Sequence, residues 1–128
     1  MGKFRGRTKQ QTKAHQFGVQ AEKLAVLYLK AKGYRIVSTR YRVGVGEIDI
    51  IARSGETVVF IEVKRRQSLD DALHSLQSRQ QARIIRAAEY WLAENELPLN
   101  TDCRFDMMVF SAYLVPHHIK NAFATDGT

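Results

Sequence analysis

The sequence predicts an α/β fold with a central mixed β-sheet flanked by helices. Segments 47–53 and 58–64 are joined by a short turn and show the two-residue alternation of strands. Segments 17–32 and 78–95 instead carry apolar residues at the three-to-four spacing of amphipathic helices. The full length of 128 residues is that of one domain.

The chain opens with a basic segment, residues 1–14, that carries five positive charges and no acid. Such a segment buries too little apolar surface to order itself, so we expect a flexible tail before a single domain over 15–128. A helix is predicted over 17–32, with Gly33 as its C-terminal stop. Glu22 lies at the border of the apolar stripe of this helix, where it is either a surface acid or part of a site.

Residues 34–42 are rich in aromatic and β-branched residues and predict a first strand, which glycines separate from the hairpin. In the first hairpin strand, alternation predicts that Ile48, Ile50 and Ala52 share one face of the sheet. The charged residues of both strands are then expected on the opposite face.

The turn sets the register of the hairpin. Gly55 suits a two-residue turn formed with the residue after it, which places Asp49 opposite Glu62 and Glu47 opposite Lys64. A turn formed with the residue before it would place Glu47 opposite Glu62. In either register the acids and the lysine lie on one face.

Beyond the hairpin, Ser68 and Ser78 are each placed to cap a helix, and the second of these helices would run to residue 95. Residues 103–110 predict a late strand. Asp106 interrupts its apolar run, and the simplest interpretation is an ion pair with an arginine.

Three arginines of the long helix, Arg79, Arg83 and Arg86, fall on one face at helical spacing and are followed by Tyr90. A row of cations with an aromatic side chain can track a nucleic-acid backbone. The alternative interpretation is an ordinary solvated helix face.

Composition limits the function. Lys and Arg outnumber Asp and Glu by 20 to 13, and the net charge of +7 favours an anionic partner such as nucleic acid over small acidic substrates, although a basic pI also serves solubility. Cys103 is the only cysteine, which excludes an intramolecular disulfide and a cysteine zinc site. The sequence contains no apolar run long enough for a signal peptide or a membrane span, so we expect a cytoplasmic protein without membrane contact.

The acids of the hairpin suggest metal chemistry. Facing carboxylates destabilise a sheet, and in a half-buried site they raise one pKa or attract a cation. Mg²⁺, or Mn²⁺ in its place, takes one or two carboxylates together with waters and substrate phosphates, so Asp49 and Glu62 are the candidate metal ligands. Lys64 is placed to hold the attacking water or to offset charge on phosphorus. The alternative is a solvated strand face with Glu47 and Lys64 as a surface ion pair.

Asp49 followed by Glu62-Val63-Lys64 resembles the PD-(D/E)XK motif of restriction-endonuclease-like nucleases. Together with Gly46-Glu47-Ile48-Asp49, this block resembles the bacterial YraN-type family of uncharacterised proteins in that superfamily, and the likeness extends over residues 17–123. The resemblance implies a restriction-endonuclease-like core.

The resemblance also implies roles for individual residues: Asp49 and Glu62 bind metal, and Lys64 supports hydrolysis. The layout is similar to that of archaeal Holliday-junction resolvases, which add a Glu from the first helix, where Glu22 stands here. This chain departs from the pattern twice, because Ile48 replaces the motif's proline and Gln80 stands where family members often carry a lysine.

We therefore expect a metal-dependent endonuclease acting on DNA, with branched or flapped DNA as candidate substrates and with Glu47 steadying Lys64. Symmetric cutting of a junction would require a homodimer. Two other functions remain open from the sequence: a nucleic-acid-binding module without catalysis, and a protein-interaction module whose basic surface meets an acidic partner.

Overall fold

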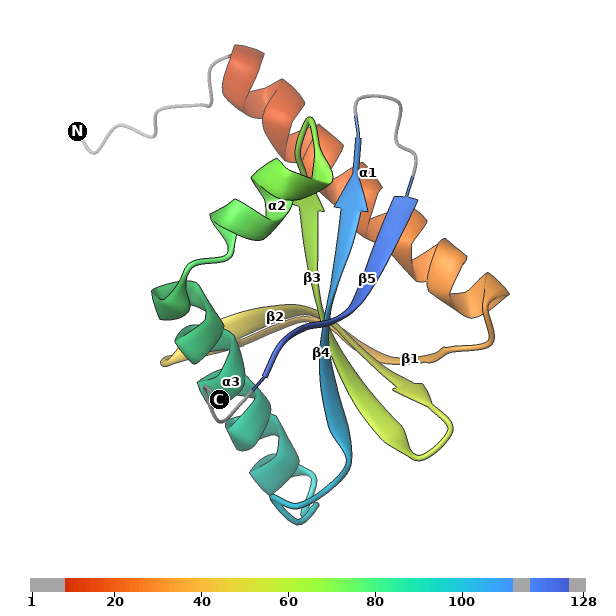
Figure 1. Ribbon diagram of the computed structural model, residues 1–128, viewed down its shortest axis with the longest axis vertical. Helices are drawn as coiled ribbons and strands as arrows, with labels where there is room; N and C mark the ends of the chain where they lie inside the picture. Colours follow the sequence, from red (N-terminus) through yellow and green to blue (C-terminus); the bar gives the residue numbers. More distant parts are fainter. Residues whose placement is uncertain (1–8, 112–115, 125–128) are drawn as a thin grey trace, which may run out of the picture.

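The computed structural model describes residues 9–111 and 116–124, with side chains from residue 20 onward. Its elements are α1 (Lys9–Ala31), β1 (Arg35–Val43), β2 (Gly46–Ser54), β3 (Thr57–Arg65), α2 (Leu69–Ser75), α3 (Ser78–Glu94), β4 (Cys103–Phe110) and β5 (Pro116–Phe123). The strands form one sheet in the order β1-β2-β3-β4-β5, in which β3 and β4 are parallel and the other neighbours are antiparallel. The predicted α/β class and mixed sheet are confirmed (Figure 1).

The helices lie on opposite faces of the sheet, with α1 on one side and α2 and α3 on the other (Figure 1). Under α3 the core includes Phe60, whose ring stacks on Phe105 at 5.3 Å and meets Trp91 edge-on at 6.0 Å. Under α1 the core is aliphatic and includes Leu29 and Ile61. Each strand of the hairpin therefore supplies apolar side chains to both layers.

The hairpin register follows the turn at Gly55, whose φ of +61° is one that glycine adopts without strain. Ser54 pairs with Thr57 and Ile50 with Ile61, which confirms the register predicted from a turn with the residue after Gly55. The pairing between β2 and β3 ends at Ile50–Ile61. The strands thus separate at the point where the acidic residues begin.

One expectation about the faces of β2 is wrong. Ile50 and Ala52 do pack together under α1, but Ile48 packs under α3 with Ile51. The alternation breaks at Asp49, where the ladder to β3 ends and where Arg40, across from it on β1, has a φ of +54°. Sequence periodicity assumes an unbroken ladder, and so it misplaces the residue beyond the break.

Helix α1 begins at Lys9 rather than at residue 17, and the predicted tail is therefore helical over residues 9–14; residues 1–8 lie outside the described part. The added turns are composed largely of Lys, Gln and Ala, which extend a helix readily once it has formed. The other end agrees with prediction: Gly33 has a φ of +92°, and the Tyr34 N–H bonds to the Leu29 carbonyl at 2.9 Å.

The two predicted serine caps have different outcomes. Ser68 caps α2, because its hydroxyl accepts the backbone N–H of Asp71 at 3.1 Å. Ser78 does not cap α3; it is the first helical residue, and Gln77 occupies the cap position without a side-chain hydrogen bond. The Gln81 side chain instead bonds to the Leu76 carbonyl at 2.9 Å, which fixes the joint between the helices.

The sequence prediction missed the last strand, β5, which contains the adjacent histidines His117 and His118. His118 faces inward, with a side chain only 3% exposed, and its Nε2 lies 2.7 Å from Asp106, while His117 is exposed. Arg104 holds both oxygens of Asp106 at 2.9 Å, as the interpretation of an arginine ion pair predicted. The Asn121 N–H donates to the same carboxylate at 3.1 Å.

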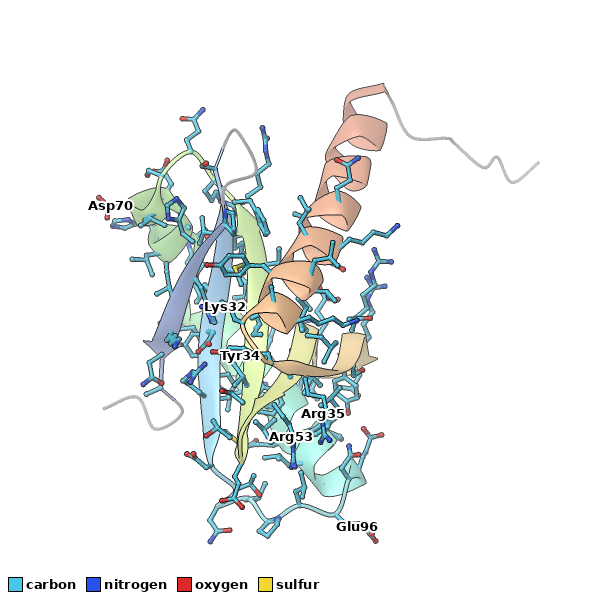
Figure 2. All side chains as sticks on the ribbon, turned by 90° about the vertical axis from the view of Figure 1, so that its right-hand side faces the viewer. Lys32, Tyr34, Arg35, Arg53, Asp70 and Glu96 are labelled. Atoms are coloured by element: carbon cyan, nitrogen blue, oxygen red, sulfur yellow. The ribbon has the colours of Figure 1, made fainter. Side chains whose placement is uncertain are left out.

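The fully buried carboxylate of Asp106 connects β5 to the junction between α1 and β1. Arg104 donates to the Tyr34 hydroxyl at 2.7 Å, and Lys32 Nζ lies 3.0 Å from His118 Nδ1. Lys32 and Tyr34 are close together where α1 passes into β1 (Figure 2). Because an ammonium only donates, Nδ1 accepts, and Nε2 carries the hydrogen that bonds to Asp106.

Helix α3 lies unusually close to β2 at Gly46. A methyl group at this glycine would overlap the carbonyl group of Arg83, lying 2.8 Å from its carbon. No neighbour could move aside cheaply, because the obstacle is helix backbone. Gly46 therefore sets the distance between α3 and the start of β2.

We predict that Gly46→Ala lowers the free energy of unfolding by about 1–3 kcal/mol, the usual cost of overfilling a packed contact. Gly44→Ala is the matched control, because a methyl group there meets nothing within 4 Å. Urea denaturation of both variants measures the difference. Equal stability of the two variants would show that α3 does not rest on Gly46.

We also predict that Asp106→Asn costs about 3–5 kcal/mol at pH 7, because it leaves the guanidinium of Arg104, whose side chain is only 20% exposed, beside a neutral group. Hydrogen bonds from His118, Arg104 and Asn121 lower the pKa of Asp106 despite its burial. Its contribution is therefore present above pH 4 and is lost as the pH falls through its lowered pKa. The gap between the two proteins, measured by urea denaturation, should narrow below pH 4, whereas the exposed control Asp70→Asn should match the wild type throughout.

Candidate functional site

A cleft of about 260 Å³ lies where β2 and β3 separate, between α1 and the start of α3. It is lined by Ala21, Glu22, Glu47, Asp49, Glu62, Val63, Lys64, Arg65 and Gln80. The five residues that the sequence singled out for chemistry all line this cleft. They come from the first helix and from both strands of the hairpin.

Asp49 holds the cleft open. Its Oδ2 accepts the backbone N–H of Val63 at 2.8 Å and so takes the place of a carbonyl in the ladder between the strands. Val63 packs toward α1, whereas its neighbours Glu62 and Lys64 point to the other side of β3, as alternation predicts. The main chain of β3 thereby fixes one oxygen of Asp49 beside Glu62.

Glu62 is almost fully buried and is held by two donors. Lys64 Nζ lies 3.3 Å from its Oε2, and the side-chain amide of Gln80 donates to the same oxygen. Both Glu62 and Lys64 are largely shielded from solvent, so their ion pair is stronger than one on an open surface. Through this hydrogen bond, Gln80 links α3 to the cleft.

Two of the predicted site acids lie at the rim. Glu22 bonds to Arg40 at 3.0 Å and is about one-quarter exposed. Glu47 is exposed and pairs with Arg42 at 3.3 Å, so the expected pair between Glu47 and Lys64 is not formed. The reason is the separation of β2 from β3: Arg42 is the cross-strand neighbour of Glu47 on β1, while Lys64 turns to Glu62.

The two central carboxyl groups interact unfavourably as anions. Burial first, and then the charge of Glu62, raise the pKa of Asp49 to about 8. A hydrogen bond between the two groups adds to the effect, and the N–H of Val63 opposes it. Without a compensating cation, the cleft therefore does not hold both carboxyl groups as anions at neutral pH, and Asp49 keeps its proton.

A divalent cation would remove this conflict. No cluster of three or more His, Cys, Asp or Glu side chains suited to a metal occurs among the described residues, so Asp49 and Glu62 form a two-carboxylate donor set. Hard oxygen ligands in this number suit Mg²⁺, which keeps several waters and binds substrate phosphate. The residues present therefore fit such an ion.

The three predicted nucleic-acid contacts, Arg79, Arg83 and Arg86, are exposed on α3 outside the cleft. Tyr90, on the same helix, is 52% exposed. The helix thus carries a cationic outer face, while Gln80, at its start, reaches inward to Glu62.

Sequence reasoning did not assign Gln80 to the site. It treated this residue as the loss of a lysine, whereas the structure gives it a contact with Glu62. Local sequence patterns gave no signal for this contact, because it depends on the close approach of α3 to β2 at Gly46.

No helix in the described ranges has the length and apolar character needed to cross a membrane.

Comparison with known proteins gives a consistent family but no activity. The model of the family described as "Uncharacterised protein family UPF0102" matches residues 21–110. A UPF0102 protein of Bradyrhizobium diazoefficiens is 47% identical over 110 residues, which cover 86% of this chain and 83% of that protein. UPF0102 proteins of Rhodopseudomonas palustris (46% identical; 86% and 84% covered) and Methylorubrum extorquens (42% identical; 88% of each covered) are similar to this chain over nearly the same extent.

We predict that Asp49→Asn stabilises the metal-free protein, and increasingly so from pH 5 to pH 8. The folded state keeps a proton on Asp49 up to about pH 8, whereas the unfolded state loses it near pH 4. Stability from this group is therefore complete below pH 4 and is lost as the pH rises toward 8. The asparagine retains an oxygen for the Val63 N–H and carries no charge.

Urea denaturation in EDTA at pH 5, 6.5 and 8 measures this effect. Glu56→Gln, which removes an exposed acid from the turn of the same hairpin, is the control for the change in net charge. A stability difference between Asp49→Asn and wild type that stays constant with pH would contradict the raised pKa.

Proposed function

Since this chain belongs to the uncharacterised protein family UPF0102, whose name gives no activity, we propose from its cleft that it is a Mg²⁺- or Mn²⁺-dependent endonuclease that hydrolyses phosphodiester bonds in DNA. The observation that carries the proposal is the close approach of Asp49 and Glu62 in a small cleft, with Lys64 beside them. A protein that only binds nucleic acid gains nothing from acids where phosphates should lie.

Asp49 and Glu62 would hold the ion, which when bound polarises a phosphoryl oxygen and lowers the pKa of water. The hydrogen bond from Val63 orients Asp49, and that from Gln80 orients Glu62, so neither carboxylate needs to reorganise. Lys64 lines the same cleft and pairs with Glu62. Its role is to hold the attacking water and to offset the negative charge that grows on the phosphate oxygens.

The remaining charged groups serve binding. Arg79, Arg83 and Arg86 offer phosphate contacts along α3, in keeping with the net charge of +7. Glu22 would complete the acidic side of the cleft, and Glu47, paired with Arg42, lies too far toward solvent to serve as a ligand. We place this activity in the cytoplasm, where DNA and Mg²⁺ occur together.

A second function is favoured by one observation. Without a cation, Asp49 keeps its proton near neutral pH and Glu62 is already satisfied by Lys64 and Gln80, so the cleft can persist without metal. A DNA-binding module without catalysis would have the same cationic helix. It would bind DNA in a salt-dependent manner and ignore Mg²⁺.

We predict that Mn²⁺ binds the wild-type protein and not Asp49→Asn, as measured by calorimetry. Cleavage of a labelled branched DNA in Mn²⁺ should fall at least about 100-fold in this variant, because metal-bound groups dominate such reactions. DNA binding in EDTA should stay within about twofold, since no phosphate contact is removed. Equal cleavage by the variant would exclude Asp49 as a ligand.

Lys64→Met separates the roles within the cleft. This variant should still bind Mn²⁺ and lose cleavage, because Lys64 acts on water rather than on the ion. Arg86→Gln serves as the control for loss of a cation from the protein: it should weaken DNA binding and its salt dependence but preserve the rate at saturating DNA. Mn²⁺ binding without cleavage in the wild type would favour the binding module.

A further inference from the structure

A second hollow, lined by residues of α1 and β1, adjoins the carboxylate cleft. It is a groove of about 710 Å³, more than twice the cleft's 260 Å³. The groove is lined by Glu22, Lys23, Val26, Leu27, Thr39 and Arg40. The proposed chemistry uses only Glu22 of this set, so the rest of the groove has no role yet.

The groove has an apolar wall and a cationic rim. Val26 and Leu27 form the wall, and the Leu27 side chain is 62% exposed, an unfavourable place for a large apolar group. Lys23 and Arg40 stand at the rim, and Thr39 adds a hydroxyl. Apolar surface bordered by cations matches a group with a flat apolar body and an attached anion.

Glu22 makes the groove continuous with the cleft, because it lines both. Arg40 Nε bonds to Glu22, and this guanidinium makes no other hydrogen bond or ion pair among the described residues. Its two terminal nitrogens can therefore bind a phosphate oxygen. A ligand in the groove would lie one short step from the carboxylates.

We propose that this groove binds one unpaired nucleotide of the DNA strand, adjacent to the phosphate that is cleaved. The base lies against Val26 and Leu27, and Arg40 and Lys23 bind its phosphate. The assignment rests on the proposed nuclease function, and it specifies the substrate class as single-stranded, flapped or branched DNA.

The requirement for an unpaired base follows from the shape of the duplex. In paired DNA both faces of each base are covered by its neighbours, so no base face is available to an apolar wall. An unpaired base can leave the stack and cover the exposed leucine, at little cost when it has no partner. An intact duplex could therefore contact the cationic side chains of the protein but not the apolar wall of the groove.

The test is binding by fluorescence anisotropy in EDTA, so that no cleavage occurs, with three labelled DNAs of one sequence: a single strand, a blunt duplex and a duplex with a 5′ flap. The wild-type protein should bind the flap and the single strand at least about tenfold more tightly than the duplex. Leu27→Glu should reduce this ratio to within about twofold of one. The ratio of affinities within a variant cancels the general effect of an added negative charge.

Leu99→Glu is the matched control, because Leu99 is 69% exposed on the loop before β4 and outside the groove. It introduces the same charge and should retain the wild-type ratio. Both variants replace exposed side chains, and circular dichroism with thermal unfolding verifies that they fold.

Each result decides the proposal. If Leu27→Glu loses the preference for unpaired DNA and Leu99→Glu keeps it, the groove assignment is supported, whether or not the protein cleaves DNA in Mn²⁺. If the wild type shows no cleavage, the groove assignment stands while the nuclease assignment fails. Cleavage in Mn²⁺ without any preference for unpaired DNA leaves the nuclease assignment standing and overturns the groove. An unchanged ratio in Leu27→Glu, equal loss in Leu99→Glu, or no binding to any of the three DNAs also overturns it.

Discussion

The site depends on one hydrogen bond, from the Val63 N–H to Asp49. In an unbroken ladder a carbonyl of β2 would accept this N–H, and the two strands would stay paired beyond Ile50 and Ile61. A carboxylate accepts it instead, at 2.8 Å, and the strands separate without leaving the donor unsatisfied. The cost of ending the ladder is thereby low, and the gap gives access to Glu62.

A second aspartate in the sheet also accepts a backbone N–H from a neighbouring strand, but its pKa changes in the opposite direction. Asp106 accepts the N–H of Asn121 from β5, at an irregularity of the ladder between β4 and β5. Arg104 and His118 surround Asp106 with donors and lower its pKa, whereas Asp49 faces another acid and its pKa rises. Two similar backbone contacts thus lead to a stable ion pair in one place and to a carboxyl group that keeps its proton at neutral pH in the other. The difference lies in the neighbouring side chains and not in the carboxylates themselves.

Sequence patterns predicted those features that depend on local periodicity. The mixed sheet, the turn at Gly55, the pairing of β2 with β3 up to Ile61 and the cap at Ser68 all follow from spacing and turn chemistry. The features that were missed depend on contacts distant in sequence. Strand β5 carries too many polar residues to show an alternation: the ring of His118 turns to the buried Asp106, and Asn121 bonds to the same carboxylate through its backbone N–H.

The candidate site shows the same division. The convergence of Asp49, Glu62 and Lys64 could be predicted because the hairpin fixes it locally. The partner of Glu47 could not be, since it depends on where the ladder stops, and Gln80 joins the site only because a glycine lets α3 approach β2. The residue pattern of the hairpin identifies the acids of the site. The side chains that bind these acids depend on how the helices pack against the sheet.

The cluster around Asp106 has a consequence for how the protein is made. Lys32 and Tyr34 leave the ribosome first, Asp106 about seventy residues later, and His118 and Asn121 last among these residues. A nascent chain that ends before His118 therefore contains the buried acid without two of the groups that bind it. The cluster around Asp106 is complete only once β5 has been translated, and ribosomal products that stop before β5 would carry an incompletely satisfied charge to the quality-control proteases of the cell.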